Sequence, residues 1–156
     1  MPDSGEVLMD GIPITPGNVS VLRNSVGVIL QEDLLFKGSI LENVALFNEQ
    51  TDMGRVEECC RLCLIHEDIM HLPLRYQSEV GDLGSNLSTG QQQRLLLARA
   101  LYKQPTMLIL DEETANLNED IEKKILHNLK SLGKTVIFSS HSRHVQDFAD
   151  AVWSVA

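Results

Sequence analysis

The sequence is poor in aromatic residues, in cationic residues and in long apolar stretches. Only 4% of its 156 residues are aromatic, and 13 lysines and arginines stand against 22 acidic residues, for a net charge of -9. A protein that binds a nucleic-acid backbone needs cations, and one that stacks on bases needs aromatic rings, so we expect no nucleic-acid partner. The chain lacks a run of about 18 apolar residues and a signal-peptide pattern, so we expect it to be soluble and not to span a membrane.

Cysteine is confined to one short cluster, Cys59, Cys60 and Cys63. A metal site or a redox pair is one interpretation of this cluster. The other is the buried face of an amphipathic helix, because Cys59 and Cys63 lie one helical turn apart. No second Cys or His pair lies at the spacing of a zinc site, which favours burial. Nothing in the pattern requires an oxidising compartment, so the cytosol is the expected location.

Short apolar runs alternate with helical patterns, which predicts an α/β fold with a mainly parallel sheet covered on both faces. Buried strands are expected at residues 25–30, 106–111 and 134–140, and a last strand at residues 151–155. The segment from residue 6 to residue 15 is expected to form a hairpin around an Asp-Gly turn.

A second region, from about residue 39 to residue 85, has helical patterns and no strand pattern in its first part. We interpret it as a helical subdomain, with the α/β core formed by residues 1–38 and 86–156. Thr51 is expected to cap one of the helices in this region.

Polar residues follow the expected strands. Asp111 and Glu112 end the run TMLILDE, His141 follows FSS, and Gln31 follows SVGVIL. Each alone has an ordinary explanation, because acidic residues are common in loops and a histidine at a strand end is more often structural than catalytic. Ligands of an open parallel sheet bind at the carboxyl ends of its strands, however, so these side chains could meet at one ligand.

The stretch NLSTGQQQRLLLARAL begins with small and amide residues and continues as a strongly apolar helix. Ser88 and Gln91 fit a capping box, which explains them as a helix start. The capping box does not explain Gly90, which costs roughly 1 kcal/mol against alanine in a helix but allows a close approach to the backbone. A helix N-terminus without blocking side chains is a receptor for an anion such as phosphate.

This stretch resembles the signature motif of ATP-binding-cassette (ABC) ATPases. Other stretches are similar to that family's motifs in the same order: VILQEDLLFKGSILENV to the Q-loop, MLILDEETANLN to the Walker B motif and D-loop, and FSSHS to the switch histidine. The resemblance covers nearly the whole chain. FKGSILENV, FNEQTD and GDLGSNLSTGQ are most similar to exporters with fused transmembrane segments, and among these to bacterial peptidase-containing bacteriocin and toxin exporters.

The resemblance implies a partial nucleotide-binding domain, with an incomplete P-loop NTPase-type sheet core and a helical subdomain, on the cytoplasmic side of the bacterial inner membrane. It implies an ATPase, with ATP and Mg²⁺ as ligands, that powers export of a peptide or protein. The implied partners are a second nucleotide-binding domain, in a head-to-tail homodimer, and the transmembrane domain of an exporter.

The resemblance also implies roles for individual residues. Asp111 and Gln31 would hold Mg²⁺, Glu112 would act as a base or orient water, and His141 would contact the γ-phosphate. The residues that would bind the ATP of the partner domain in trans are Ser88, Thr89, Gly90 and Gln91.

The chain departs from the family pattern in three ways. Thr89 stands where glycine is usual, and Asn118 stands where the D-loop usually ends in aspartate. The phosphate-cradling loop G-x-x-x-x-G-K-S/T is missing. Gly133-Lys134-Thr135 does not supply it, because Asn128 takes the place of the first glycine and a helix, not a strand, precedes it. We expect that loop to lie upstream of this chain, and we expect the chain alone to be inactive.

Two other functions stay open. The chain could be a non-catalytic interaction module that contributes its signature helix to the ATPase site of a partner. It could also belong to the related chromosome-maintenance and DNA-repair ATPases. Those carry long coiled coils, whereas the segment between Gln31 and the GDLG stretch has no heptad run, and the acidic charge is unfavourable for DNA.

Overall fold

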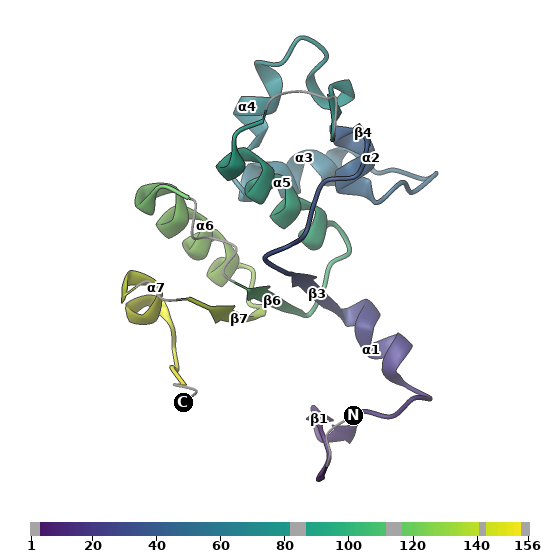
Figure 1. The fold of residues 1–156 in the computed structure, drawn as a ribbon, viewed down its shortest axis with the longest axis vertical. Coiled ribbons are helices and arrows are strands. Elements are labelled where there is room, and N and C mark those ends of the chain that lie inside the picture. The colour runs from purple at the N-terminus through teal and green to yellow at the C-terminus, as the bar shows by residue number, and fades with distance from the viewer. Residues whose placement is uncertain (1–3, 82–86, 112–116, 141–142, 154–156) are drawn as a thin grey trace.

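The computed structural model describes residues 4–81, 87–111, 117–140 and 143–153 of the chain (Figure 1). Near its start, β1 (Leu8–Met9) and β2 (Ile12–Pro13) form an antiparallel pair. Asp10 and Gly11 between them have φ values of 52° and 77°, the left-handed conformation that a tight hairpin turn requires. The expected hairpin is therefore confirmed.

A parallel sheet with the strand order β3-β6-β7 forms the α/β core. Its strands are β3 (Val26–Ile29), β6 (Met107–Asp111) and β7 (Thr135–Ser139), each within a run expected to be a strand. β6 pairs in parallel with both neighbours, so the carboxyl ends of all the strands lie at one edge. The α/β fold class is confirmed. The expected last strand is wrong for residues 151–153, which adopt no strand, and residues 154 and 155 lie outside the described part.

The region after β3 is mainly helical, as expected, and the subdomain boundaries at about residues 39 and 85 stay a prediction. The prediction that Thr51 caps a helix in this region is wrong. The N-cap of the helix that begins at Met53 is Asp52, whose side chain accepts a hydrogen bond from the Arg55 N–H at 3.1 Å. The hydroxyl of Thr51 is used in the preceding turn, where it donates to the Asn48 carbonyl. The elements are β4 (Gly38–Ser39), α2 (Ile40–Ala45), α3 (Met53–Leu62), α4 (His66–Met70), the short 3-10 helix η1 (Arg75–Gln77) and β5 (Glu79–Val80), with β4 and β5 antiparallel.

The remaining helices are α1 (Val19–Ser25), α5 (Thr89–Tyr102), α6 (Glu119–Ser131) and α7 (Arg143–Phe148). Helix α1 was not expected from the sequence, and none of its residues is buried. In Figure 1, α5 extends from α4 toward β3, and it packs against α2, α3 and β3. None of the described helices is long and apolar enough to cross a membrane.

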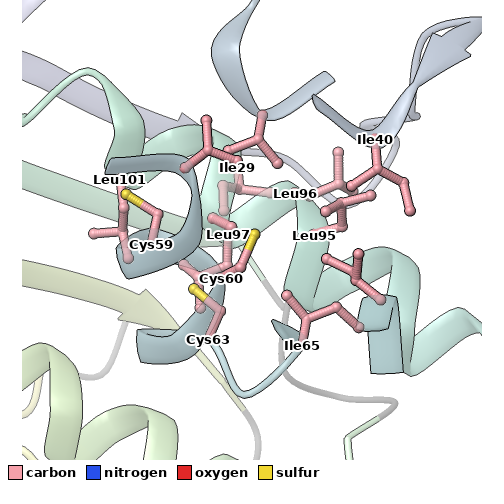
Figure 2. Packing of buried hydrophobic residues seen from close by; sticks show 14 of the residues in the cluster. Ile29, Ile40, Cys59, Cys60, Cys63, Ile65, Leu95, Leu96, Leu97 and Leu101 are labelled. Carbon is pink, nitrogen blue, oxygen red and sulfur yellow. The ribbon is translucent and has the colours of Figure 1, made fainter. Parts of the chain in front are cut away.

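The three cysteines lie in the main hydrophobic core (Figure 2). Cys60 and Cys63 are fully buried and Cys59 nearly so, beside α5 residues such as Leu95 and Leu97. All of them are free thiols. The interpretation of this cluster as a buried helix face is confirmed.

The sheet has one covered face and one open face, which corrects the expectation of two covered faces. Leu108 and Leu110 of β6 are buried in the core. On the other face, Val28, Ile109 and Ile137 lie side by side in register across the strands, and Val28 and Ile137 are 46% and 45% exposed. Residues of α5 and α6 belong to the same core cluster as Leu108 and Leu110.

Burial makes the cysteine thiols poor nucleophiles. It raises the pKa of Cys59 from 9.0 to about 11 and that of Cys60 to about 12, and it raises the pKa of Cys63 well above its usual value. For Cys59 alone, a pKa of about 11 in place of 9.0 lowers the thiolate fraction at pH 8 by roughly a hundredfold. We expect an aromatic disulfide reagent at pH 8 to label the native thiols at least that much more slowly than the urea-unfolded chain.

The stability of the folded chain should also depend on pH. Because the native state keeps the thiols protonated, it should lose stability as the pH rises through 9 to 11, where the unfolded chain ionises first. Fast labelling of the folded chain at pH 8 would contradict the burial of these side chains.

Candidate functional site

The N-terminal end of α5 is closed by the predicted capping box. The Ser88 hydroxyl accepts a hydrogen bond from the Gln91 N–H at 3.3 Å, and the Gln91 side-chain oxygen accepts one from the Ser88 N–H at 2.9 Å. Ser88 and Thr89 are exposed, while the body of the helix is buried from Arg94 to Ala98. A buried helix therefore presents its N-terminal end to solvent, with the backbone N–H groups that an anion would bind.

Two further side chains fix this helix end to the helical region. The Gln91 amide nitrogen donates to one oxygen of Asp68 at 3.0 Å, and Arg94 binds the other oxygen at 2.9 Å. Arg94 also donates to the carbonyls of Gly90 and Leu64. Sequence reasoning missed Asp68 and Arg94. An arginine inside an apolar helix was the one available signal, because such a residue needs buried acceptors.

The sheet register brings two of the predicted strand-end residues to the same edge. Ile29 lies opposite Leu110, so Asp111 at the end of β6 and Gln31 just beyond β3 leave the sheet on the same side. The Asp111 carboxylate accepts a hydrogen bond from the Ser139 hydroxyl of β7 at 2.6 Å. Gln31 is exposed. Glu112, Glu113 and His141 lie outside the described residues.

The segment Gly133-Lys134-Thr135 does not form a phosphate-binding loop. Gly133 follows the end of α6 with a φ of 64°, the left-handed conformation of a glycine that terminates a helix, and β7 begins at Thr135. The Lys134 ammonium donates to the Pro105 carbonyl. The expected order, helix before and strand after, is confirmed.

The sequence of the chain matches a known family along most of its length. The family model described as ABC transporter matches residues 1–115, a stretch that contains the α5 end, Gln31 and Asp111. The chain belongs to the ABC transporter family.

Relatives and a solved structure agree with this assignment. Colicin V secretion/processing ATP-binding protein CvaB of Escherichia coli is 37% identical over 154 residues, which are 99% of this chain and 22% of that protein. Toxin RTX-III translocation ATP-binding protein of Actinobacillus pleuropneumoniae is 37% identical over 154 residues, 97% of this chain and 22% of that protein. A bacterial Atm1-family ABC exporter with ATP bound has a TM-score of 0.86 and 31% identity, over 97% of this chain and 26% of that one. The chain spans about a fifth of the length of these curated relatives.

The loop after Gln31, which the sequence predicts to be a Q-loop, is held at its far end by a buried amide. Asn43 of α2 is fully buried, accepts from the Phe36 N–H at 2.8 Å, and donates to the carbonyls of Phe36 and Ser39. From α5, Arg99 donates to the Leu34 carbonyl at 3.0 Å and lies over the Phe36 ring. Sequence reasoning missed both anchors. They connect the loop after Gln31 to α2 and to α5.

Asn118, which stands where the family's D-loop usually ends in aspartate, has a local structural role. Asn118 is the N-cap of α6, and its side-chain oxygen accepts a hydrogen bond from the Asp120 N–H at 2.9 Å. Asparagine and aspartate are equally good N-caps, so the exchange keeps the helix start while removing one charge at the surface.

The strand edge has oxygen donors that suit Mg²⁺. Asp111 supplies a carboxylate and Gln31 an amide oxygen, the ligand types that this cation prefers. Within the part of the chain that the structure describes, no group of three or more His, Cys, Asp or Glu side chains is placed to hold a metal ion.

The capping box makes a prediction about stability. Ser88→Ala removes the acceptor for the Gln91 N–H and should lower the free energy of unfolding by about 1 kcal/mol. Thr89→Ala changes an exposed hydroxyl one residue away and should alter it by less than about 0.5 kcal/mol. Urea unfolding of the three proteins compares these values, and equal losses for the two variants would contradict the capping role of Ser88.

Proposed function

We propose that the chain is part of the ATP-binding domain of an ABC exporter, in which ATP hydrolysis powers transport of a peptide or protein. The observation that carries this proposal is the exposed, capped end of α5, attached to a helix whose body is buried. Two relatives that match nearly the whole chain have names that refer to colicin V secretion and to toxin translocation. Their names support a polypeptide substrate.

In this proposal, the α5 end binds the ATP held by a second nucleotide-binding domain in a head-to-tail homodimer. The Ser88 hydroxyl and the backbone at Thr89 and Gly90 are exposed or partly exposed, so they can approach a γ-phosphate. Both polar ends of the Gln91 amide are engaged by Ser88 and Asp68. Gln91 therefore holds the N-terminal end of α5 in place, and it also puts a polar side chain close to the phosphate.

The strand edge performs the chemistry on the chain's own side of the dimer. Asp111 and Gln31 would hold Mg²⁺, which when bound neutralises charge on the β- and γ-phosphates. The Ser139 hydroxyl donates to one Asp111 oxygen and so fixes the orientation of this carboxylate. Glu112 would orient the attacking water or take its proton, and His141 would contact the γ-phosphate.

The loop after Gln31 would transmit the state of the nucleotide to the transmembrane domain. It starts at the strand edge and ends in the bonds of Asn43 and Arg99, so a displacement of Gln31 reaches α2 and α5 directly. In this proposal the chain works on the cytoplasmic side of the bacterial inner membrane, beside the transmembrane domain that it drives.

The isolated chain should bind ATP weakly and hydrolyse none, because it holds no lysine-bearing loop for the β- and γ-phosphates and Lys134 is bound to Pro105. Titration with a fluorescent ATP analogue and a phosphate-release assay measure both properties. Saturable binding at low micromolar concentration together with turnover would overturn this expectation.

The exposed, capped α5 end also supports a second function, a module that completes the ATPase site of a partner. We expect the chain to raise the ATPase rate of the purified ATP-binding domain of the colicin V relative when it is added in excess. Ser88→Arg, which places a large side chain at the α5 end, is the matched variant and should abolish the increase. No increase with the unmodified chain would count against this function.

A further inference from the structure

We propose that Asp68 is a positioning residue for the end of α5 that faces the nucleotide. Its carboxylate sits between Gln91 and Arg94, and it fixes the direction in which the backbone N–H groups of the first turn point. This inference rests on the proposed function, since it adds a second layer of residues behind the same phosphate-binding end.

The two oxygens of Asp68 have different tasks. The first accepts from the amide nitrogen of Gln91 at 3.0 Å, and this contact selects which end of that amide faces Ser88. The Gln91 oxygen is then available to accept from the Ser88 N–H, which closes the capping box. Asp68 thus determines the orientation of the cap through its hydrogen bond with Gln91.

The second oxygen of Asp68 balances a buried cation. The Arg94 side chain is 9% exposed, and the carboxylate lies 2.9 Å from its guanidinium. The same guanidinium donates to the Gly90 carbonyl at 3.2 Å, within the first turn of α5, and to the Leu64 carbonyl just before α4. Without the carboxylate, Arg94 would be a buried charge without a counterion, which is strongly unfavourable. Arg94 therefore holds the first turn of α5 at the Gly90 carbonyl, and Asp68 holds it at the Gln91 side chain.

These contacts join two parts of the molecule. Asp68 belongs to α4, and in Figure 1 α4 lies at the end of α5 that is far from the sheet. A displacement of α4 relative to the core would turn the Gln91 amide and Arg94 together, and with them the N–H groups of the first turn. The helical region can in this way adjust how well the site on the partner domain is completed.

Amide hydrogen exchange tests the positioning directly. Asp68→Asn keeps the shape of the side chain but faces an amide N–H₂ toward one of the two donors. We expect exchange at the amides of Gln91 and Gln92 to become about tenfold faster, while Leu97 in the middle of α5 is unchanged. Glu67→Gln, the same loss of charge at the exposed neighbour in α4, is the matched control and should change neither.

A second variant keeps the test decisive if Asp68→Asn does not fold. Gln91→Glu retains an oxygen for the Ser88 N–H but replaces the donor to Asp68 with a carboxylate. It should speed exchange at the same two amides. Unchanged exchange in the first turn, or a uniform increase along all of α5, would overturn the positioning role.

The mixing assay with the colicin V relative's ATP-binding domain then tests the functional consequence. At saturating chain concentration, Asp68→Asn should lower the stimulated rate about tenfold, and Asp68→Glu should recover most of it because it retains both acceptors. A merely unstable variant would shift the chain concentration needed for half of the effect and leave the plateau unchanged, which would overturn the proposal. If the unmodified chain gives no stimulation while the exchange pattern holds, the proposed completion of a partner's ATPase site fails and the positioning role of Asp68 stands.

Discussion

The burial of α5 is the constraint on which the rest of the structure depends. Its apolar body packs on α2, α3 and β3, so the helix belongs to the helical region and to the sheet at once. Its N-terminal end remains in solvent, and a helix end in that position must satisfy its own N–H groups or offer them to a ligand. The capping box satisfies part of this requirement, and the first turn is otherwise exposed or partly exposed to solvent. Without the buried body, the end would have no fixed direction.

Local patterns in the sequence were enough to predict most of the elements. The strands around Val28, Ile109 and Ile137 are continuous apolar runs, and their parallel pairing follows from the helices between them. The capping box at Ser88 and the hairpin turn at Asp10 depend on residues within a few positions of each other, so a single sequence contains all the information they need. The chemistry expected at the strand edge follows from the order of the strands, since parallel strands end on one side.

The features that the sequence did not reveal depend on contacts between distant residues or on competition between neighbours. Asp68 meets Gln91 across 23 positions, and Arg99 meets the Leu34 carbonyl across 65, so no local pattern indicates either pair. The choice of Asp52 over Thr51 as a cap was settled by a turn that uses the Thr51 hydroxyl first. The last strand was expected from an apolar run alone, and such a run does not form a strand unless a neighbouring strand is placed to pair with it.

The open face of the sheet has a consequence for the fate of the chain in a cell. Val28 and Ile137 lie on β3 and β7, the two edges of the described sheet, so apolar side chains and an unpaired strand edge occur together there. Edges of this kind pair readily with other chains, and proteases and chaperones remove proteins that expose them. A polypeptide that covers this face would therefore keep these apolar side chains and strand edges from associating with other chains.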